Sequence, residues 1–441
     1  MNRFRSIFLA TMLMVTIQGQ TMAKSSTKID YLKSGNEKAS KGDTRGAIAD
    51  YSKAVAGDAK NATAFLNRGA VKLSTGDQNG AEVDFARAIK LNPGYAEAWY
   101  NSGIAKSELK DFKGSIDAYT KAIELDPKLV GVYFNRAVAK GGAGDRAGAI
   151  ADYSKAVELQ PGNAEAWNNR GVLKNQAGDK DGAIADFVKA VNAWFKNGIA
   201  RASKGDLKGA LADYDKAVAL SPKFGDAINN RGNVRNALGD RNGAITDYTK
   251  AIELNPSGSL AYGNRAFVKA VLKDKEGSLA DYGKAIELDS KNAQLYIARG
   301  MAQSAFGNPE AALGDYSKAV KLNPESSLAF LNRGNVQFQL GKKKEALADY
   351  SKAVQLDPKN ADAWYNLGFV RAENTDHAGS QSDFDKAIDL NPGYSKAFYK
   401  RSLAKSALGD EKGAVEDMKH AAKLGLESAR TLLKSKDISW E

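Results

Sequence analysis

The side chains that most often carry out chemistry are few in this chain, and their spacing fits no common active site. The 441 residues include no cysteine, which excludes disulfides and thiolate metal sites. The two histidines, His377 and His420, lie 43 residues apart, a poor basis for a metal site or a catalytic dyad. Residues 142–147 (GAGDRA) match part of a dinucleotide-binding fingerprint, but no strand is predicted before them. We therefore expect no enzyme activity, no cofactor and no bound metal.

Arginine and aspartate occur together along the chain at a separation that allows ion pairs. The pairs, 16 residues apart, are Arg68 and Asp84, Arg136 and Asp152, Arg170 and Asp186, Arg231 and Asp247, Arg265 and Asp281, Arg299 and Asp315, Arg333 and Asp349, and Arg401 and Asp417. Three related segments have only the aspartate (Asp50, Asp213, Asp383), and none has only the arginine. An unpaired arginine between packed helices costs more than an aspartate that can turn to solvent. We predict a structural ion pair in which loss of Asp247 costs on the order of 3 kcal/mol by leaving Arg231 unpaired.

These pairs belong to twelve copies of one repeated unit. A small residue marks each copy: Gly35, Gly69, Gly103, Ala137, Gly171, Gly198, Gly232, Ala266, Gly300, Gly334, Gly368 and Ser402. Every interval is 34 residues, except the 27 residues from Gly171 to Gly198. We number each unit 1–34 with the small residue at position 8, so that the array occupies residues 28–428.

The apolar spacing within each unit predicts two helices, A and B. Position 4 is aromatic in eleven copies, position 24 is Tyr or Phe in eleven, and position 27 is Ala in all twelve. Positions 4, 8 and 11 share one helical face, and positions 20, 24 and 27 share another. Gly at position 15 ends helix A in nine copies, and Pro at position 32 ends helix B in eight. Each unit is therefore a helix–turn–helix.

This pattern resembles the tetratricopeptide repeat (TPR) family, in an Asn-Arg-Gly variant of exported bacterial type. The family signature has a 34-residue period with Trp at position 4, Gly at 8, Ala at 20, an aromatic at 24, Ala at 27 and Pro at 32. One copy carries it as Trp364, Gly368, Ser380, Phe384, Ala387 and Pro392. The resemblance covers about nine-tenths of the chain and departs at position 7, where Arg replaces the usual Leu. It implies an all-α fold, an α-solenoid (right-handed superhelix) of twelve helical hairpins, with a C-terminal capping helix at residues 427–436.

In TPR proteins helix A lines a concave groove, and the resemblance gives position 6 a candidate role there. We call the eight asparagines at this position the asparagine ladder: Asn67, Asn101, Asn135, Asn169, Asn230, Asn264, Asn332 and Asn366. An amide both donates and accepts hydrogen bonds, so such a row can hold a peptide backbone without reading its sequence. The neighbouring Tyr100, Phe134, Phe267 and Tyr365 favour an apolar or amphipathic ligand. The alternative is that each asparagine only bonds neighbouring helices.

Positive charges at two other sets of positions bear on the choice of partner. Positions 12 and 13 have no Lys or Arg in any copy, so we do not expect the terminal carboxylate binding of chaperone-binding relatives. Position 26 is basic in eleven copies and forms a stripe on the outer face of helix B: Lys53, Arg87, Lys121, Lys155, Lys189, Lys216, Lys250, Lys284, Lys318, Lys352 and Lys386. Such a stripe could bind anionic lipid or cell-wall polymer. Nearby Glu124, Glu158, Glu253 and Glu287 instead favour charge pairing along the helix.

The N-terminus has the composition of a cleaved signal peptide, residues 1–23. Arg3 and Arg5 precede an apolar stretch at residues 7–17 that is too short to span a bilayer. The small residues Thr21 and Ala23 follow it. Removal of the two arginines lowers the net charge from +12 to +10. We expect an exported protein, periplasmic or secreted, with no later transmembrane segment and no nucleic acid partner.

The 27-residue interval identifies the most irregular point of the array. Repeat five lacks positions 28–34, and we divide the array there into residues 24–190 (repeats 1–5), 191–428 (repeats 6–12) and 429–441 (capping helix and tail). Helix B of repeat five either ends in a short turn at residues 191–193 or continues into the next helix A. We favour the short turn, because it preserves the packing between repeats on which such arrays depend.

These observations predict a non-catalytic interaction scaffold. Extended or amphipathic peptide segments of an unidentified protein would bind in the concave groove. The alternative is a cell-envelope anchoring protein whose basic stripe binds anionic lipid or cell-wall polymer.

Overall fold

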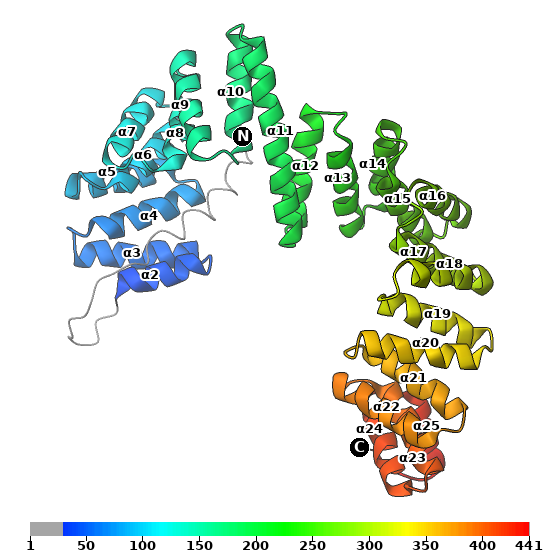
Figure 1. Cartoon of the computed structure of the whole chain (residues 1–441). Helices are drawn as coiled ribbons and strands as arrows, with labels where there is room; N and C mark the ends of the chain where they lie inside the picture. Colours follow the sequence, from blue (N-terminus) through cyan, green and yellow to red (C-terminus); the bar gives the residue numbers. More distant parts are fainter. Residues whose placement is uncertain (1–29, 441) are drawn as a thin grey trace. The chain divides into compact units, whose positions relative to one another are not determined.

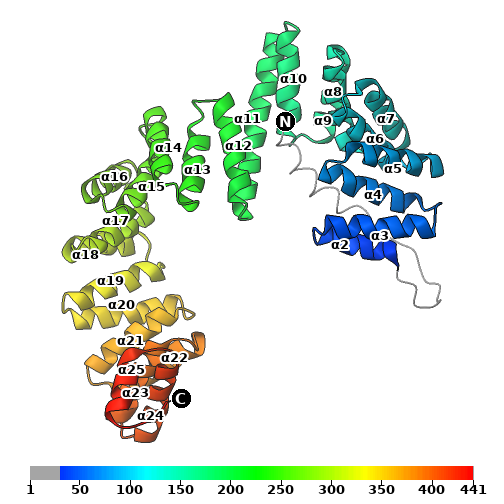
Figure 2. The same ribbon diagram turned by 180° about the vertical axis from the view of Figure 1, so that it is seen from behind.

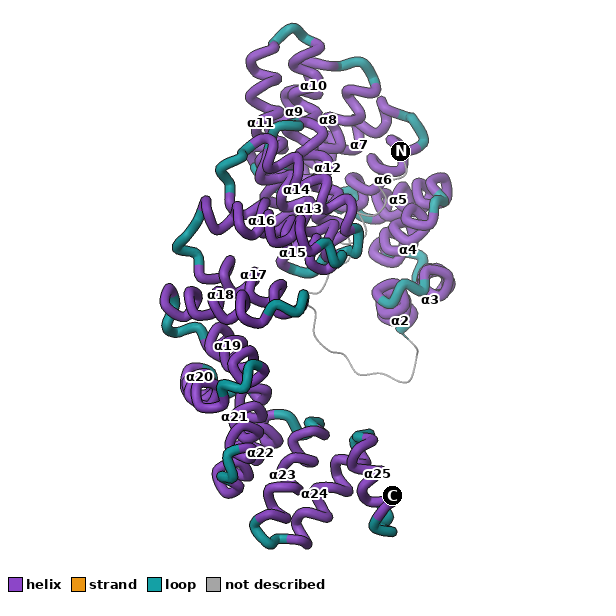
Figure 3. Tube along the Cα trace, turned by 90° about the vertical axis from the view of Figure 1, so that its right-hand side faces the viewer, coloured by secondary structure: helices purple, strands orange, loops and turns teal. Residues whose placement is uncertain are grey.

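The computed structural model describes residues 30–440 and is helical almost throughout, with no strand in that range (Figure 3). The helices are α2 (Tyr31–Ser40), α3 (Thr44–Gly57), α4 (Ala62–Thr75), α5 (Gln78–Leu91), α6 (Ala96–Glu108), α7 (Phe112–Leu125), α8 (Val130–Gly142), α9 (Arg146–Leu159), α10 (Ala164–Gln176), α11 (Lys180–Ser203), α12 (Leu207–Leu220), α13 (Gly225–Ala237), α14 (Arg241–Leu254), α15 (Ser259–Val271), α16 (Lys275–Leu288), α17 (Ala293–Ala305), α18 (Pro309–Leu322), α19 (Ser327–Gln339), α20 (Lys343–Leu356), α21 (Ala361–Glu373), α22 (His377–Leu390), α23 (Ser395–Ala407), α24 (Glu411–Lys423) and α25 (Glu427–Ser435). The predicted all-α solenoid fold is confirmed. The predicted signal peptide, residues 1–23, lies outside the described residues.

The contacts between helices divide the chain into two compact units after Pro222. The first unit holds repeats one to six up to α12, and the second holds α13 to α25. Within each unit, the two helices of a hairpin pack on each other and on the next hairpin (Figure 1). The predicted boundary after residue 190 lies inside helix α11. Within residues 30–440, no helix has the length and apolar composition required to cross a membrane.

The turns within hairpins form because of the residues that the repeat places there. Gly76 follows α4 with φ of 90°, a left-handed conformation that glycine adopts without a steric penalty. The carboxylate of Asp77 then caps α5 by accepting a hydrogen bond from the Gly80 amide at 2.9 Å. Three copies without the glycine have the same left-handed backbone at Lys110, Lys273 and Thr375, with φ of 62–64°.

The two helices of each hairpin approach closely because small residues face aromatic rings. A Cβ added at Gly103 would lie 2.5 Å from the Tyr119 ring, a distance that real Cβ atoms do not tolerate. Ala149 and Ala156, at positions 20 and 27, are fully buried. The recurring small residues therefore set the separation of helices A and B.

The connection after repeat five differs from the prediction. Helix α11 is one continuous 24-residue helix that passes through residues 191–193, where we predicted a short turn (Figures 1 and 2). The prediction of a turn was wrong because neither Gly nor Pro lies between Gly182 and Gly198 to stop the helix. Trp194, in the second half of this helix, has a buried side chain. The Asn197 side chain donates to the carbonyl oxygen of Gly162 at 3.3 Å.

The C-terminal helix covers the last repeat. Helix α25 places Ala429 and Leu433, both almost fully buried, in a cluster with Met418 and Ala422 of α24. It occupies the residues predicted for a capping helix, and it ends the array without an exposed apolar face.

Candidate functional site

The arginine at position 7 and the aspartate at position 23 form two parallel hydrogen bonds in each of the eight copies that have both. In repeat eight, Arg265 donates from Nε to Oδ2 of Asp281 at 2.8 Å and from Nη2 to Oδ1 at 2.7 Å. The same paired bonds join Arg68 to Asp84, Arg136 to Asp152, Arg170 to Asp186, Arg231 to Asp247, Arg299 to Asp315, Arg333 to Asp349 and Arg401 to Asp417. This geometry fixes both the distance and the rotation between helices A and B.

A second cation, at position 11, completes the pair, and the sequence analysis overlooked it. Lys269 Nζ lies 2.8 Å from Oδ2 of Asp281, and Lys or Arg has the corresponding contact in five other paired copies. In the three copies that lack the arginine, this cation binds the aspartate alone. The contacts are Lys38 to Asp50, Arg201 to Asp213, and Arg371 to Asp383, at 2.6–2.9 Å. In the sequence analysis we had allowed these aspartates to turn to solvent. In the structure each of them is instead bound by this cation. The basic residue at position 11, one helical turn after position 7, could have predicted this contact from the sequence.

In repeat eight and four other copies, the arginine also connects its hairpin to the one before it. Arg265 Nη1 donates to Oγ1 of Thr249 at 2.9 Å, and Thr249 in turn donates to the Ile245 carbonyl oxygen at 2.7 Å. Equivalent bonds reach Ser52, Thr120, Ser154 and Asp385 from the arginines of the following repeats. The guanidinium lies 5.8 Å from the ring centre of Tyr262, within the range of cation–π attraction. The Arg265 side chain thus bonds helix B of its own hairpin and helix B of the preceding hairpin.

Burial and neighbouring cations shift the pKa of two of these aspartates, Asp281 and Asp383, in opposite directions. Burial raises the pKa of Asp281, but the hydrogen bonds from Arg265 and Lys269 outweigh it, and the net pKa lies below the ordinary value. Burial raises the pKa of Asp383 to about 6, because Arg371 offsets only part of the desolvation. The same position of the repeat therefore holds carboxylates with opposite shifts.

We expect these two aspartates to contribute to stability with opposite pH dependence. The lowered pKa of Asp281 stabilises the folded state above the unfolded pKa, and this contribution is lost as the pH falls through the folded pKa. For Asp383 the unfolded chain loses its proton first, so the free energy of unfolding falls as the pH rises from about 4 to about 6. Carboxyl ¹³C NMR titration measures both values. An Asp383 that titrates below Asp281 contradicts this assignment.

Removing the aspartate should cost most where two cations depend on it. We expect Asp281→Ala to lower the free energy of unfolding by about 3 kcal/mol, because Arg265 and Lys269 lose their partner. The matched variant Asp383→Ala should cost less, because its carboxylate is incompletely compensated. Urea unfolding, with hydrogen exchange of α15 and α16, measures the difference. Equal losses in the two variants would argue against the ion pair as the main contact.

The asparagine ladder bonds the preceding repeat at five of its eight positions. Asn67 donates to Asn36 at 2.9 Å, Asn135 to Tyr100 at 2.9 Å, Asn169 to Tyr153 at 3.2 Å, Asn264 to Asn229 at 3.1 Å and Asn366 to Asn335 at 3.0 Å. Asn101 is buried, while Asn230 and Asn332 are half-buried. The amides therefore link neighbouring helices. Each such bond uses one N–H, so the other N–H keeps its hydrogen-bonding capacity. The carbonyl oxygen of Asn169 also accepts from Asn168 at 3.4 Å.

The four aromatic residues predicted to lie beside the ladder occupy different environments. Tyr100 packs on Tyr119 with ring centres 5.9 Å apart, and burial raises the pKa of its phenol. Phe134 packs edge-on against Tyr153, whereas Phe267 is 52% exposed. Tyr365 stacks on Tyr394 and forms part of a pocket. Only some of the predicted row is therefore available to a ligand.

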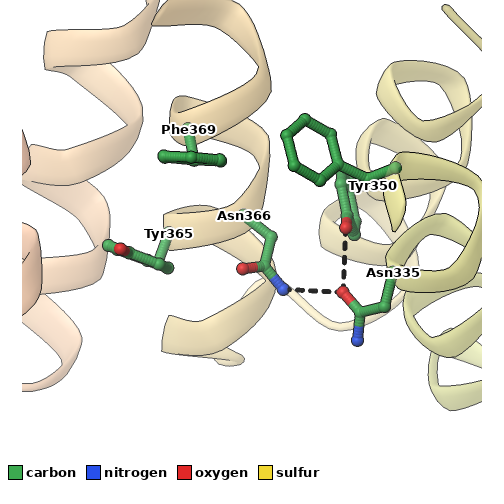
Figure 4. A pocket seen from close by; sticks show the side chains of 6 residues that line it. Asn335, Tyr350, Tyr365, Asn366 and Phe369 are labelled. Atoms are coloured by element: carbon green, nitrogen blue, oxygen red, sulfur yellow. Dashed lines mark hydrogen bonds between the residues drawn. The ribbon is translucent and has the colours of Figure 1, made fainter. Parts of the chain in front are cut away.

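One open pocket brings ladder and aromatic residues together. Its volume is about 220 Å³, and it is lined by Asn335, Phe338, Tyr350, Tyr365, Asn366 and Phe369 from helices α19, α20 and α21 (Figure 4). Asn335 Oδ1 accepts hydrogen bonds from Tyr350 Oη at 2.8 Å and from Asn366 Nδ2 at 3.0 Å (Figure 4). Of its six residues, the sequence analysis had singled out Tyr365 and Asn366 as candidate site residues.

A lysine that the sequence analysis did not consider contacts one of the residues that line this pocket. Lys400 of α23 holds position 6 of repeat twelve, where most copies have asparagine, and its Nζ lies 4.6 Å from the ring centre of Phe369. It forms no salt bridge with any carboxylate of residues 30–440. An uncompensated positive charge therefore lies against Phe369, although positions 12 and 13 of the repeats have no Lys or Arg.

The other chemistry considered from the sequence finds little support. Four lysines of the basic stripe bond glutamates three residues later: Lys121 to Glu124, Lys155 to Glu158, Lys250 to Glu253 and Lys284 to Glu287, at 2.7–2.9 Å. Such pairing reduces the net charge that the stripe offers to an anionic surface. Within residues 30–440, no three His, Cys, Asp or Glu side chains form a group that could hold a metal ion.

Comparisons with known proteins agree with the repeat assignment. Family models described as tetratricopeptide repeat match residues 96–129, 134–192, 225–257, 293–326 and 361–394, and one described as TPR repeat matches residues 35–76 and 334–374. These ranges together cover more than half of the chain. No curated protein matches the sequence.

Several solved structures are similar over part or most of the chain. MamA is 28% identical over 39% of this chain and 98% of its own, with a TM-score of 0.36. YrrB, described as a TPR protein with an unusual peptide-binding site, is 26% identical over 43% of this chain and 98% of its own, with a TM-score of 0.37. Yeast Tom70 is 18% identical over 92% of this chain and 94% of its own, with a TM-score of 0.38.

Proposed function

Because this chain belongs to the tetratricopeptide repeat family, we propose that it is a non-catalytic scaffold that binds an extended peptide segment of another protein. The principal binding site would be the pocket between α19, α20 and α21, with Lys400 of α23 at its edge. The observation that carries this proposal is the combination of free amide groups, aromatic walls and an unpaired cation in one place.

The two pocket asparagines are oriented to bond a peptide backbone. Asn335 is held by its two hydrogen bonds through Oδ1, and Asn366 is held through its Nδ2. Figure 4 shows the amide nitrogen of Asn335 and the carbonyl oxygen of Asn366 directed away from these bonds. These two atoms supply a donor for a peptide carbonyl and an acceptor for a peptide N–H. Fixed side chains lose little entropy on binding.

The aromatic residues around the asparagines would accept one apolar side chain of the peptide. Phe338 and Phe369 pack edge to face with ring centres 5.4 Å apart. The ring of Tyr365 stacks on Phe369 with ring centres 6.4 Å apart. All three line the pocket. An apolar side chain inserted there removes aromatic surface from water, which is the main source of binding free energy at such sites.

Lys400 gives the site a preference for negative charge. Its ammonium lies over Phe369 and has no acidic partner among residues 30–440. A carboxylate of the peptide next to the inserted side chain would pair with it. We therefore propose a ligand segment in which a bulky apolar residue lies beside an acidic group.

Selection from a random peptide library displayed on phage tests this preference. We expect selected peptides to combine an apolar and an acidic residue. Asn335→Ala with Asn366→Ala should weaken their binding about 30-fold, the loss of about 2 kcal/mol from two hydrogen bonds. Lys400→Gln should weaken it about 5-fold, with a difference that shrinks at high salt. Isothermal titration calorimetry of the selected peptides measures each change.

Repeats one and two supply a matched control. Asn36 accepts from Tyr51 at 2.8 Å and from Asn67 at 2.9 Å, the same arrangement as in the pocket. Ala39, Leu66 and Ala70 stand where the pocket has Phe338, Tyr365 and Phe369. Asn36→Ala with Asn67→Ala should leave binding unchanged. A loss equal to that of the pocket variant would show that the effect is structural.

We also propose that the protein acts outside the cytoplasm. Residues 1–23 support this through their two arginines, short apolar stretch and small residues before Lys24. N-terminal sequencing of the protein from its native cells should find Lys24 as the first residue. Retention of Met1 would contradict an exported, processed form.

A further inference from the structure

Helix α13, the first helix of repeat seven, is unusually rich in asparagine. Its four asparagines are Asn229, Asn230, Asn233 and Asn236, and no other helix A in the array has as many. The spacings of four and three residues place Asn229, Asn233 and Asn236 on one face of the helix. Asn233 is exposed and the other two are half-buried.

Two of these amides are held in place through their oxygen atoms. Asn229 Oδ1 accepts a hydrogen bond from Asn264 Nδ2 of α15 at 3.1 Å. Asn233 Oδ1 accepts from Tyr248 Oη of α14 at 2.8 Å. Neither Asn229 Nδ2 nor Asn233 Nδ2 donates to any residue within 30–440. Both amides are therefore oriented by the fold and still have donor groups to offer.

The arrangement differs from that of the pocket in the number of donors. In the pocket both bonds end at Asn335, which leaves the amide nitrogen of that one residue. On α13 the bonds are divided between Asn229 and Asn233, whose positions lie about 6 Å apart along the helix axis. Carbonyl groups on one edge of an extended chain recur every second residue, about 6.6 Å apart. The two donors therefore match two successive carbonyl groups of an extended peptide.

Exposed apolar side chains of α15 lie next to these amides. Leu260 is 68% exposed, Phe267 52% and Val271 44%. Their spacing of seven and four residues places them on one face of α15, with Asn264 between Leu260 and Phe267. Because Asn264 bonds Asn229, this face adjoins the asparagines of α13. A peptide held by the amides can therefore place an apolar side chain against α15.

One acidic residue gives this surface a charge opposite to that beside the pocket. Asp226 is exposed in the first turn of α13, three residues before Asn229. It forms no salt bridge with any residue of the described range. Lys400, in contrast, lies against Phe369 of the pocket. A basic group is therefore the charged group that complements α13.

We propose that α13 and α15 form a second binding site, which takes an extended peptide segment with a basic residue beside an apolar one. Asn229 and Asn233 donate to two carbonyl groups of this segment. Leu260 and Phe267 contact its apolar side chain, and Asp226 pairs with its basic residue. The site goes beyond the pocket of the proposed function, and neither site depends on the other.

Selection from a displayed random peptide library tests this site when the pocket is disabled. The target is the full chain with Asn335→Ala and Asn366→Ala. We expect selected peptides to combine a basic and an apolar residue. Adding Asn229→Ala with Asn233→Ala should weaken their binding about 30-fold in isothermal titration calorimetry. Failure to recover any peptide, or peptides that bind both chains equally, overturns the proposal.

The reverse selection separates this proposal from the proposed function. A chain with Asn229→Ala and Asn233→Ala still has an intact pocket. Peptides recovered on it should need Asn335 and Asn366, whatever the outcome for α13. Failure of one site therefore leaves the result for the other unchanged.

A variant that keeps the internal hydrogen bonds tests the role of the two donors. Asn229→Asp with Asn233→Asp retains the oxygens that accept from Asn264 and Tyr248, and it replaces only the Nδ2 groups. Binding should weaken, although the added negative charge attracts a basic residue. Unchanged or tighter binding shows that the amides do not hold the peptide and overturns the proposal.

Two further variants test the charge and the specificity of the effect. Asp226→Asn should weaken binding about 5-fold, with a smaller difference at high salt. No change at low salt contradicts the preference for a basic residue. The control is Asn168→Ala with Asn175→Ala on α10, which should leave binding unchanged. A loss equal to that of the α13 variant would show that the effect is structural and overturn the proposal.

Discussion

The paired hydrogen bonds between arginine and aspartate are the constraint on which the hairpins depend. A buried guanidinium must be fully bonded, and its planar geometry accepts few arrangements of the partner carboxylate. In repeat eight, Arg265 satisfies this requirement with Asp281 of its own hairpin and Thr249 of the preceding one. The position of helix A is therefore fixed relative to two B helices. In six of the eight ladder positions the asparagine directly precedes this arginine, so the same bonds orient that part of the ladder.

Three of the six residues that line the pocket lie in a repeat that lacks this constraint. Repeat eleven has Leu367 in place of the arginine, and Asp383 has only Arg371 as its cation. Burial of that carboxylate raises its pKa to about 6. The same repeat supplies Tyr365, Asn366 and Phe369 to the pocket. The departure from the common pattern thus coincides with half of the residues of the proposed binding pocket, which agrees with function residing in sites on a shared fold.

The repetition of the sequence explains which features could be predicted from it. Twelve copies provide internal comparisons, so the helices, the turns and the Arg–Asp pairs are visible as recurring residues. The turn after repeat five was predicted wrongly because we gave packing between repeats more weight than the absence of a helix-ending residue. The pocket could not be predicted, because Phe338, Phe369 and Lys400 each occur at a position that varies among the copies. Their proximity is a property of three-dimensional packing.

The continuous helix also changes how the array unfolds. In a stack joined by turns, one hairpin can lose its structure while its neighbours keep theirs, since each contributes its own stability. Repeats five and six share α11, and Trp194 and the bond from Asn197 to Gly162 anchor its second half to the region where α10 begins. Neither repeat can melt without disrupting the helix of the other. The seven missing residues therefore join two hairpins into one cooperative folding unit at the centre of an otherwise modular chain.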